Sequence, residues 1–239
     1  MTVPKYLTVK QEAPQTADMY ISGEVVTDEY NKSDTSASGF RDALQAVGSV
    51  STINLHINSP GGSVFEGIAI ENMLKQNKAK VNVYVDGLAA SIASVIAMSG
   101  DTIFMPENAM MMIHNPWEIV MGNASELRKA ADDLDQITKA SVVTYLAKAG
   151  DKLDEVKLTD LMDHETWLTA NEAVGYGLAD QVIEANQVAA SISPKLMDSY
   201  RHVPESLTRK PSEENNYRQR LQQKAKQSNQ LVNSTLGGF

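Results

Sequence analysis

The sequence of 239 residues contains no cysteine, which excludes disulfide bonds, thiolate metal ligands and a cysteine nucleophile. It also lacks any run near the roughly 20 apolar residues that span a bilayer, and its amino end has no apolar segment behind a basic start. We therefore expect a cytoplasmic protein with no membrane partner. Basic residues are fewer than acidic ones, and the net charge of -9 disfavours nucleic acid as the main partner of the folded part.

Charge and composition change towards the carboxyl end of the chain. Beyond residue 200 there are seven basic and three acidic residues, and the stretch from residue 211 (PSEENNYRQRLQQKAKQSNQ) has too few large apolar residues to bury a face. We divide the chain into an amino-terminal extension (1–18), one domain (19–186) and a polar, basic tail (187–239). The tail is expected to be a flexible, solvated arm, with a segment that docks on a partner as the alternative.

Strand and helix patterns alternate along the domain, which predicts an α/β fold. Short β-branched or aromatic segments predict strands at 19–26, 53–57, 81–85, 102–105 and 181–184. Apolar spacings of three and four predict helices at 39–47, 63–76 and 91–99, a long one at 124–149, and a short one around 172–174. Residues 165–169 are expected to be extended. Strand, turn and helix thus recur as a unit.

The first motif with chemical potential is NSPGGS at 58–63, directly after a predicted strand. A Pro-Gly-Gly turn at this place leaves backbone N–H groups available at the start of the next helix, where they can hold an oxyanion. By itself such a turn is more often an ordinary connection. Its weight depends on the two motifs that follow.

The second motif is DGLAASIAS at 86–94, another junction between a strand and a helix. Ser91 lies where the chain turns into the helix, so its hydroxyl can be exposed while the amide of Ile92 faces a developing oxyanion. A serine at this position is more commonly a helix cap. The pattern is not GxSxG, so it does not indicate an α/β-hydrolase elbow.

The third motif is MMMIHNP at 110–116, in which His114 follows an apolar run and precedes Asn-Pro. We expect the histidine at the end of a strand, where its ring can project into a cleft and serve as the base for a serine nucleophile. His56 lies within a predicted strand, His164 in a charged loop and His202 in the tail, so they are weaker candidates.

In order and spacing, INSPGG, GLAAS, MIH before Asn-Pro and WLTANEAVGYGLAD resemble the ClpP family of serine peptidases. The resemblance implies a ClpP/crotonase-like α/β fold with a protruding handle helix at 124–149. It also implies that Ser91 is the nucleophile, that His114 is the base, and that Gly62 and Ile92 supply the oxyanion-hole amides. The phrases MMIHNPW and ETWLTANEA resemble the ClpP-related head-maturation (prohead) proteases of tailed phages more than the housekeeping enzyme.

The third member of the triad departs from the family pattern. The family's aspartate lies two residues before an aromatic-Leu pair, and here Glu165 stands at that place before Trp167. Asp163 is the alternative, because residues 163 and 165 of an extended segment face the same side. Either carboxylate can orient the ring of His114 and stabilise its cation.

The resemblance implies cleavage of peptide bonds without a metal or organic cofactor. It implies self-association into rings and protein substrates such as phage capsid or scaffold proteins in the host cytoplasm. Two alternatives stay open: a degradative ClpP subunit that works with a Clp-type ATPase, and a crotonase-like enzyme that binds acyl-CoA. A relative of the signal-peptide peptidases would need a lysine base, and none of the motifs contains one.

Overall fold

The computed structural model describes residues 7–8, 15–185, 200 and 202–204. Its centre is an eight-stranded, mostly parallel sheet in the order β1-β2-β4-β6-β7-β10, in which β8 also pairs with β6, and β9 with β8. A second sheet consists of β3 and β5 alone. The strands are β1 (Leu7–Thr8), β2 (Thr16–Ile21), β3 (Glu24–Val25), β4 (Thr52–Ser59), β5 (Gly61–Gly62), β6 (Lys80–Ala90), β7 (Thr102–Pro106), β8 (Met110–Ile113), β9 (Thr166–Thr169) and β10 (Gln181–Ile183).

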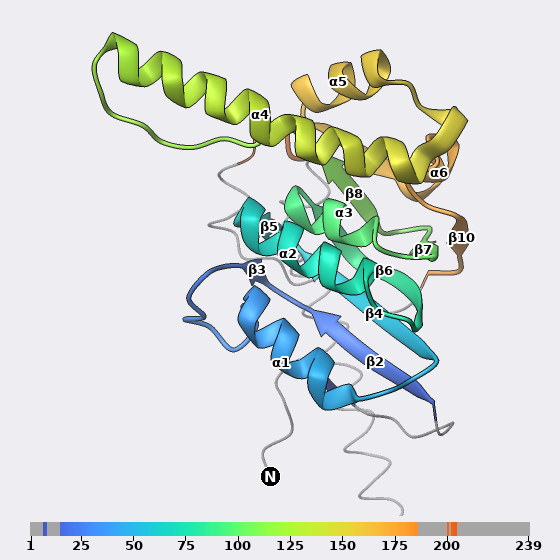
Figure 1. Cartoon of the computed structure of the whole chain (residues 1–239). Coiled ribbons are helices and arrows are strands. Elements are labelled where there is room, and N and C mark those ends of the chain that lie inside the picture. Colours follow the sequence, from blue (N-terminus) through green and yellow to red (C-terminus); the bar gives the residue numbers. More distant parts are fainter. Residues whose placement is uncertain (1–6, 9–14, 186–199, 201, 205–239) are drawn as a thin grey trace, which may run out of the picture. The chain divides into compact units, whose positions relative to one another are not determined.

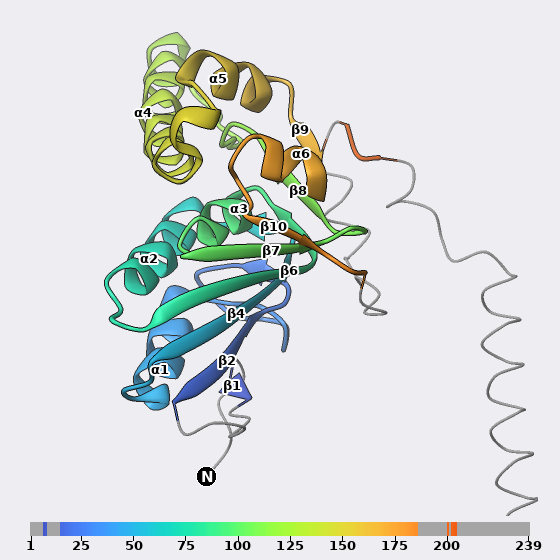
Figure 2. The ribbon, with the colours of Figure 1, turned by 90° about the vertical axis from the view of Figure 1, so that its right-hand side faces the viewer.

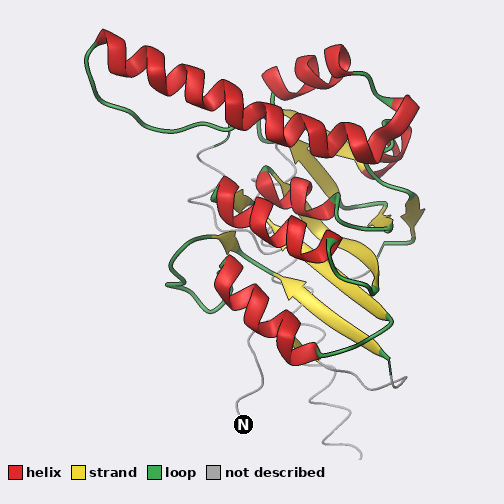
Figure 3. Cartoon of the chain, viewed as in Figure 1, coloured by secondary structure: helices red, strands yellow, loops and turns green. Residues whose placement is uncertain are grey.

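Helices alternate with these strands, and the predicted α/β class is confirmed (Figure 3). They are α1 (Ala37–Val47), α2 (Val64–Lys75), α3 (Ile92–Ala97), α4 (Ala124–Ala149), α5 (Glu155–Asp163) and α6 (Ala170–Gly175), with a 3-10 turn η1 (Gly150–Lys152) after α4. Helices α1, α2 and α3 lie side by side over one face of the sheet (Figure 1, Figure 2). No helix within the described residues has the length and apolar character needed to cross a membrane.

The core lies between the sheet and the helices, and α4, α5 and α6 contribute buried residues to it as well as α1, α2 and α3. Strand β4 alternates half-buried and buried residues along its whole length, as a strand with one fully covered face does. The register places Met19 of β2, Leu55 of β4 and Val83 of β6 next to one another, and all three side chains are fully buried. Side chains of the opposite face stack across the same strands, with His56 between Tyr20 and Tyr84.

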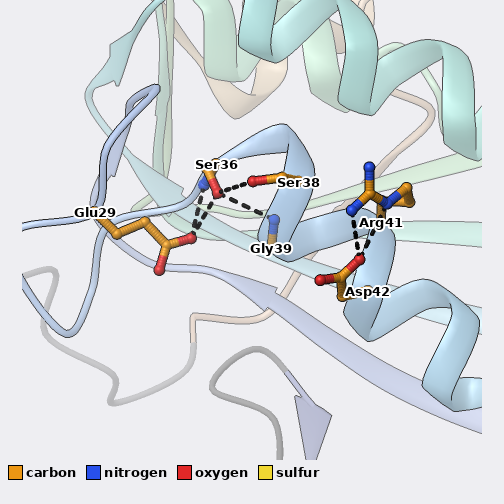
Figure 4. A network of polar contacts seen from close by, with 6 residues as sticks. All are labelled: Glu29, Ser36, Ser38, Gly39, Arg41 and Asp42. Carbon is orange, nitrogen blue, oxygen red and sulfur yellow. Dashed lines mark hydrogen bonds and ion pairs between the residues drawn. The ribbon is translucent and has the colours of Figure 1, made fainter.

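Helix α1 begins in a network of polar contacts (Figure 4). The hydroxyl of Ser36 accepts a hydrogen bond from the amide of Gly39, and the same hydroxyl donates to Oε1 of Glu29 at 2.8 Å. On α2, Glu66 Oε2 accepts from the amide of Ala37 at 2.7 Å. These acceptors pair amides at the start of α1 that have no partner within the helix.

Helix α4 is the long helix predicted at 124–149, and its capping box of Asn123 and Glu126 is present. Its buried residues, Ser141, Val142, Tyr145 and Ala149, all belong to the second half. The first half extends beyond the sheet, as expected for a handle (Figure 1).

One prediction of secondary structure was wrong and one was confirmed in part. The single strand expected at 19–26 is two strands in different sheets, because the chain turns at Gly23, where φ is 146° and a Cβ would lie 2.6 Å from the carbonyl oxygen of Ser33. Of the segment expected to be extended at 165–169, residues 166–169 form β9, whereas Glu165 lies in a turn with a φ of 48°, and Asp163 ends α5. Helix α5 was not predicted at all.

Strand β6 is longer than predicted, and this extra length positions the motifs. Residues 82–84 pair with β7, whereas Leu88, Ala89 and Ala90 pair with Met110, Met111 and Met112 of β8. The change of neighbour follows a register shift between β4 and β6. The ends of β6 and β8 therefore meet side by side, directly before Ser91 and His114.

A few of the described residues fall within the expected amino-terminal extension and the expected tail. Strand β1 and the first residues of β2 lie within the expected extension at 1–18. Of the expected tail at 187–239, only residues 200 and 202–204 lie within the described part. The predicted flexibility of the remainder stays a prediction.

Candidate active site

Ser91 follows β6 directly and stands at the N-cap position of α3, but its side chain makes no capping hydrogen bond. Its φ is 54° and its ψ is -129°. Among the described residues, only Ser91 and Glu165 combine a positive φ with a side chain. Backbone strain of this kind persists only where surrounding contacts hold it, and it concentrates at functional sites. The geometry thus differs from that of an ordinary helix cap.

A hydrogen-bond network from β8, α3 and α4 holds this strained turn. The amide of Ser91 donates to the carbonyl of Met112 at 2.9 Å. The hydroxyl of Ser94 donates to the carbonyl of Ser91 at 2.6 Å and lies 2.6 Å from the hydroxyl of Tyr145 on α4. Tyr145 is buried, and burial raises the pKa of its phenol, so the hydroxyl remains a donor. Sequence reasoning gave no role to either residue: Ser94 ends the second motif, and Tyr145 lies outside all three motifs.

His114 follows β8, as expected, and its Nε2 lies 2.8 Å from Oγ of Ser91. Burial lowers the pKa of His114 below its ordinary value of 6.5, and the charge of Glu165 opposes that shift. The ring is therefore neutral at neutral pH and can accept a proton. Of the weaker candidates, His56 binds Asp86 through Nδ1 on the sheet face and His164 contacts Asp160.

Both candidate carboxylates line one pocket together with His114. Asp163 Oδ1 accepts a hydrogen bond from Nδ2 of Asn115 at 2.6 Å. Glu165 Oε1 accepts from the amide of His202 at 2.8 Å. Of the two carboxylates, it is the charge of Glu165 that raises the pKa of His114. The electrostatic coupling to the ring therefore favours Glu165 over Asp163.

The Pro-Gly-Gly turn packs directly against the serine. A Cβ added to Gly61 would lie 2.7 Å from Cβ of Ser91 and 3.2 Å from the amide nitrogen of Ile92. A Cβ on Gly62 would lie 2.1 Å from the carbonyl oxygen of Val25. Both glycines have positive φ, so this close approach requires residues without a side chain.

The chain at Gly62 is fixed against β3. The amide of Ser63, the next residue, donates to the carbonyl of Val25 at 2.7 Å. Gly62 is exposed and follows Gly61, which packs against Ser91 and Ile92.

Tyr200 brings a further side chain to the site from beyond the expected domain. Its ring lies edge-on to the ring of His114, with centroids 5.7 Å apart, and edge-on to Trp167 at 5.8 Å. Its hydroxyl donates to the carbonyl of Pro60. No motif in the sequence marks this tyrosine, which lies far along the chain from all three motifs.

A comparison with models of protein families finds one match that covers most of the chain. The model described as Clp protease matches residues 15–186. The matched range contains all three motifs and both candidate carboxylates.

Proposed function

Because the chain belongs to the Clp protease family and is therefore a serine peptidase, we propose that Ser91, His114 and Glu165 are its catalytic residues. The observation that carries this assignment is the 2.8 Å distance between Nε2 of His114 and Oγ of Ser91. It lies within hydrogen-bond reach for transfer of a proton from nucleophile to base. The absence of a capping bond from Ser91 supports the same role.

The proposed reaction follows from these positions. Nε2 of His114 takes the hydroxyl proton as Oγ of Ser91 attacks a peptide carbonyl carbon. The oxyanion that forms accepts hydrogen bonds from the amides of Gly62 and Ile92. His114 then gives the proton to the amine nitrogen as the peptide bond breaks, which leaves an acyl ester on Ser91. His114 takes a proton from water as the water attacks the ester, and it gives that proton to Oγ of Ser91 as the acyl bond breaks and the acid product leaves.

In this proposal, Glu165 stabilises the imidazolium form of His114 during both steps. The support is the charge of Glu165, which raises the pKa of His114 against the effect of burial. Asp163 is the alternative acid, because it lines the same pocket.

We further propose that the enzyme processes capsid or scaffold proteins during maturation of a phage head. The basis is the resemblance of MMIHNPW and ETWLTANEA to the phage-type members of the family. A degradative subunit that serves a Clp-type ATPase is the competing role. The serine-histidine contact supports a peptidase over a crotonase-like enzyme that binds acyl-CoA.

Self-association is proposed from the apolar surface at the start of the handle. Large apolar side chains are exposed here, and Ile119 and Met121 reach 88% and 94% exposure. Such a patch on a free chain is typical of a protein interface. The other members of the patch are Trp117, Val120 and Leu127.

The decisive experiment compares wild type with Ser91→Ala during co-expression with capsid or scaffold proteins, read out by intact mass. Cleavage by wild type and none by Ser91→Ala is expected, while Ser49→Ala, an exposed serine outside the site, should retain wild-type processing. Equal processing by wild type and Ser91→Ala would overturn the assignment. Cleavage of folded substrates only after addition of a Clp-type ATPase and ATP would instead support the degradative role.

A further inference from the structure

Tyr200 packs against an apolar cluster at the ends of β6 and β8, beside the proposed nucleophile and base. Its ring is partly buried, and it approaches Trp167 and His114 edge-on. The cluster consists of Trp167 and side chains from the two strand ends, and we call the place that they form around the tyrosine ring the aromatic hollow: Leu88, Ala90, Met110, Met112 and Trp167. Aromatic rings favour such edge-to-face contacts beyond the apolar area that they bury.

Polar contacts anchor the same short segment to the site. The hydroxyl of Tyr200 donates to the carbonyl of Pro60. Burial raises the pKa of the Tyr200 phenol and the charge of Glu165 adds to the rise, while hydrogen bonding with the Ser91 side chain opposes it. The phenol therefore stays protonated as a donor. Two residues on, the amide of His202 donates to Oε1 of Glu165 at 2.8 Å.

We propose that Tyr200 and His202 bind in the active-site cleft as an internal ligand that shields Ser91 and must leave before a peptide substrate can enter. The proposal rests on the proposed peptidase function and names its regulation and substrate class. A substrate that reaches Ser91 has to replace the same contacts, so the aromatic hollow selects a peptide with an aromatic side chain.

The tether makes this ligand effective although its contacts are few. Tyr200 is joined to the domain through the chain that follows β10, which ends at Ile183. Because the segment belongs to the same chain, its binding is intramolecular and is governed by an effective concentration rather than by the protein concentration. A free peptide must compete with this segment. The apparent affinity of the peptide is its intrinsic affinity multiplied by the fraction of time that the cleft is open.

Within the described part of the chain, a buried polar group of the residue that Tyr200 contacts is unsatisfied while the tyrosine ring is bound. The indole N–H of Trp167 is buried and finds no acceptor among the described residues. An unpaired buried donor weakens the bound state relative to one in which water or a peptide carbonyl accepts its hydrogen bond. The internal ligand is therefore displaceable.

The test measures how fast a fluorophosphonate labels Ser91 in the full chain, by intact mass, in four proteins. These are wild type, Tyr200→Ala, Tyr200→Phe and the control Tyr30→Ala, whose ring is 88% exposed outside the site. If the cleft is open about one tenth of the time, Tyr200→Ala labels about tenfold faster than wild type. Tyr200→Phe keeps the ring but loses the bond to Pro60, so it falls between the two, and Tyr30→Ala matches wild type.

A second readout does not depend on activity. The chain has two tryptophans, so a Trp117→Phe background leaves Trp167 as the sole emitter. Removal of Tyr200 in this background should shift the emission of Trp167, whereas Tyr30→Ala should not.

The outcomes separate the two proposals. Equal labelling of Ser91 in wild type and Tyr200→Ala would overturn the internal ligand and leave the peptidase assignment intact. Absence of both Ser91 labelling and peptide hydrolysis in all four proteins would overturn the peptidase assignment, and with it the proposal that Tyr200 and His202 shield Ser91. An unchanged Trp167 emission in Tyr200→Ala would also refute the contact.

A synthetic peptide tests the substrate class directly. The peptide DSYRHVP, which copies residues 198–204, should slow labelling of Tyr200→Ala in a concentration-dependent manner. The matched peptide with alanine in place of tyrosine should be at least about tenfold weaker, because it cannot fill the aromatic hollow. Equal inhibition by the two peptides would contradict selection of an aromatic side chain.

Discussion

The buried pair Ser94 and Tyr145 should show strong energetic coupling, because one hydroxyl proton depends on the other residue. The single proton of Ser94 is directed to the carbonyl of Ser91 or Met112. The contact of 2.6 Å between the two hydroxyls therefore uses the proton of Tyr145, with Ser94 Oγ as its acceptor. Tyr145 is only 1% exposed, so water cannot replace this acceptor.

The three variants should lose different amounts of stability. Ser94→Ala leaves the phenol of Tyr145 buried without an acceptor, which costs about 2 kcal/mol, within a range of about 1–3. Tyr145→Phe removes the phenol hydroxyl and leaves Ser94 bonded to carbonyls, so it should lower the free energy of unfolding by about 1 kcal/mol. In the double variant no phenol is stranded, so its loss should be about 2 kcal/mol rather than the sum of about 3.

The assay is urea unfolding of the four proteins at one protein concentration, combined as a double-mutant cycle. We expect a coupling of at least about 1 kcal/mol, with Ser94→Ala also slowing the labelling of Ser91, because it releases the strained turn. Additive losses, within about 0.3–0.5 kcal/mol, would refute the reasoning. So would a double variant less stable than the sum of its parts.

The site makes three further predictions. Gly61→Ala should abolish labelling of Ser91, because the added Cβ would lie 2.6 Å from the carbonyl oxygen of Ala90. The control Gly48→Ala also has a positive φ, but nothing among the described residues lies within 4 Å of its Cβ. It should lower the free energy of unfolding by only about 1–2 kcal/mol and leave labelling normal. The labelling rate should fall with acidification through a pKa below 6.5, because the base must be neutral and burial lowers the pKa of His114. Glu165→Gln should move that midpoint to lower pH, because the charge of Glu165 raises the pKa of His114, and it should also reduce turnover. Asp163→Asn should leave the midpoint in place. The reverse pattern would assign the role of the acid to Asp163.

Local sequence patterns were sufficient to predict most elements of the sheet and helix layers. The β-branched segment at 53–57 predicted β4, and apolar spacings of three and four predicted α4 with the bounds that it has in the structure. Such signals depend on neighbours a few residues apart, so no tertiary contact is needed to recognise them. The split of 19–26 was missed because the turn at Gly23 depends on the close approach of Ser33.

The candidate site was predicted in part for the same reason. The sequence placed Ser91 and His114 at the ends of strands, and the pairing of β6 with β8 brings these ends together. The choice between Glu165 and Asp163 could not be made from a period-two argument, because the segment is a helix end and a turn. The two-residue period of side chains applies to strands, and residues 163–165 do not form one.

The sequence by itself determined the class of fold, the order of the motifs and the chemistry that they can supply. Tertiary structure alone decided that the side chain of Ser91 does not cap a helix. It also decided that Tyr145 contacts Ser94, 51 residues away, and so supports the turn at Ser91. Tyr200 likewise bonds to Pro60, 140 residues away, only in the folded chain. The physical reason is that strand and cap signals are local, whereas a hydrogen bond between distant residues exists only after the sheet and helices have packed and excluded water.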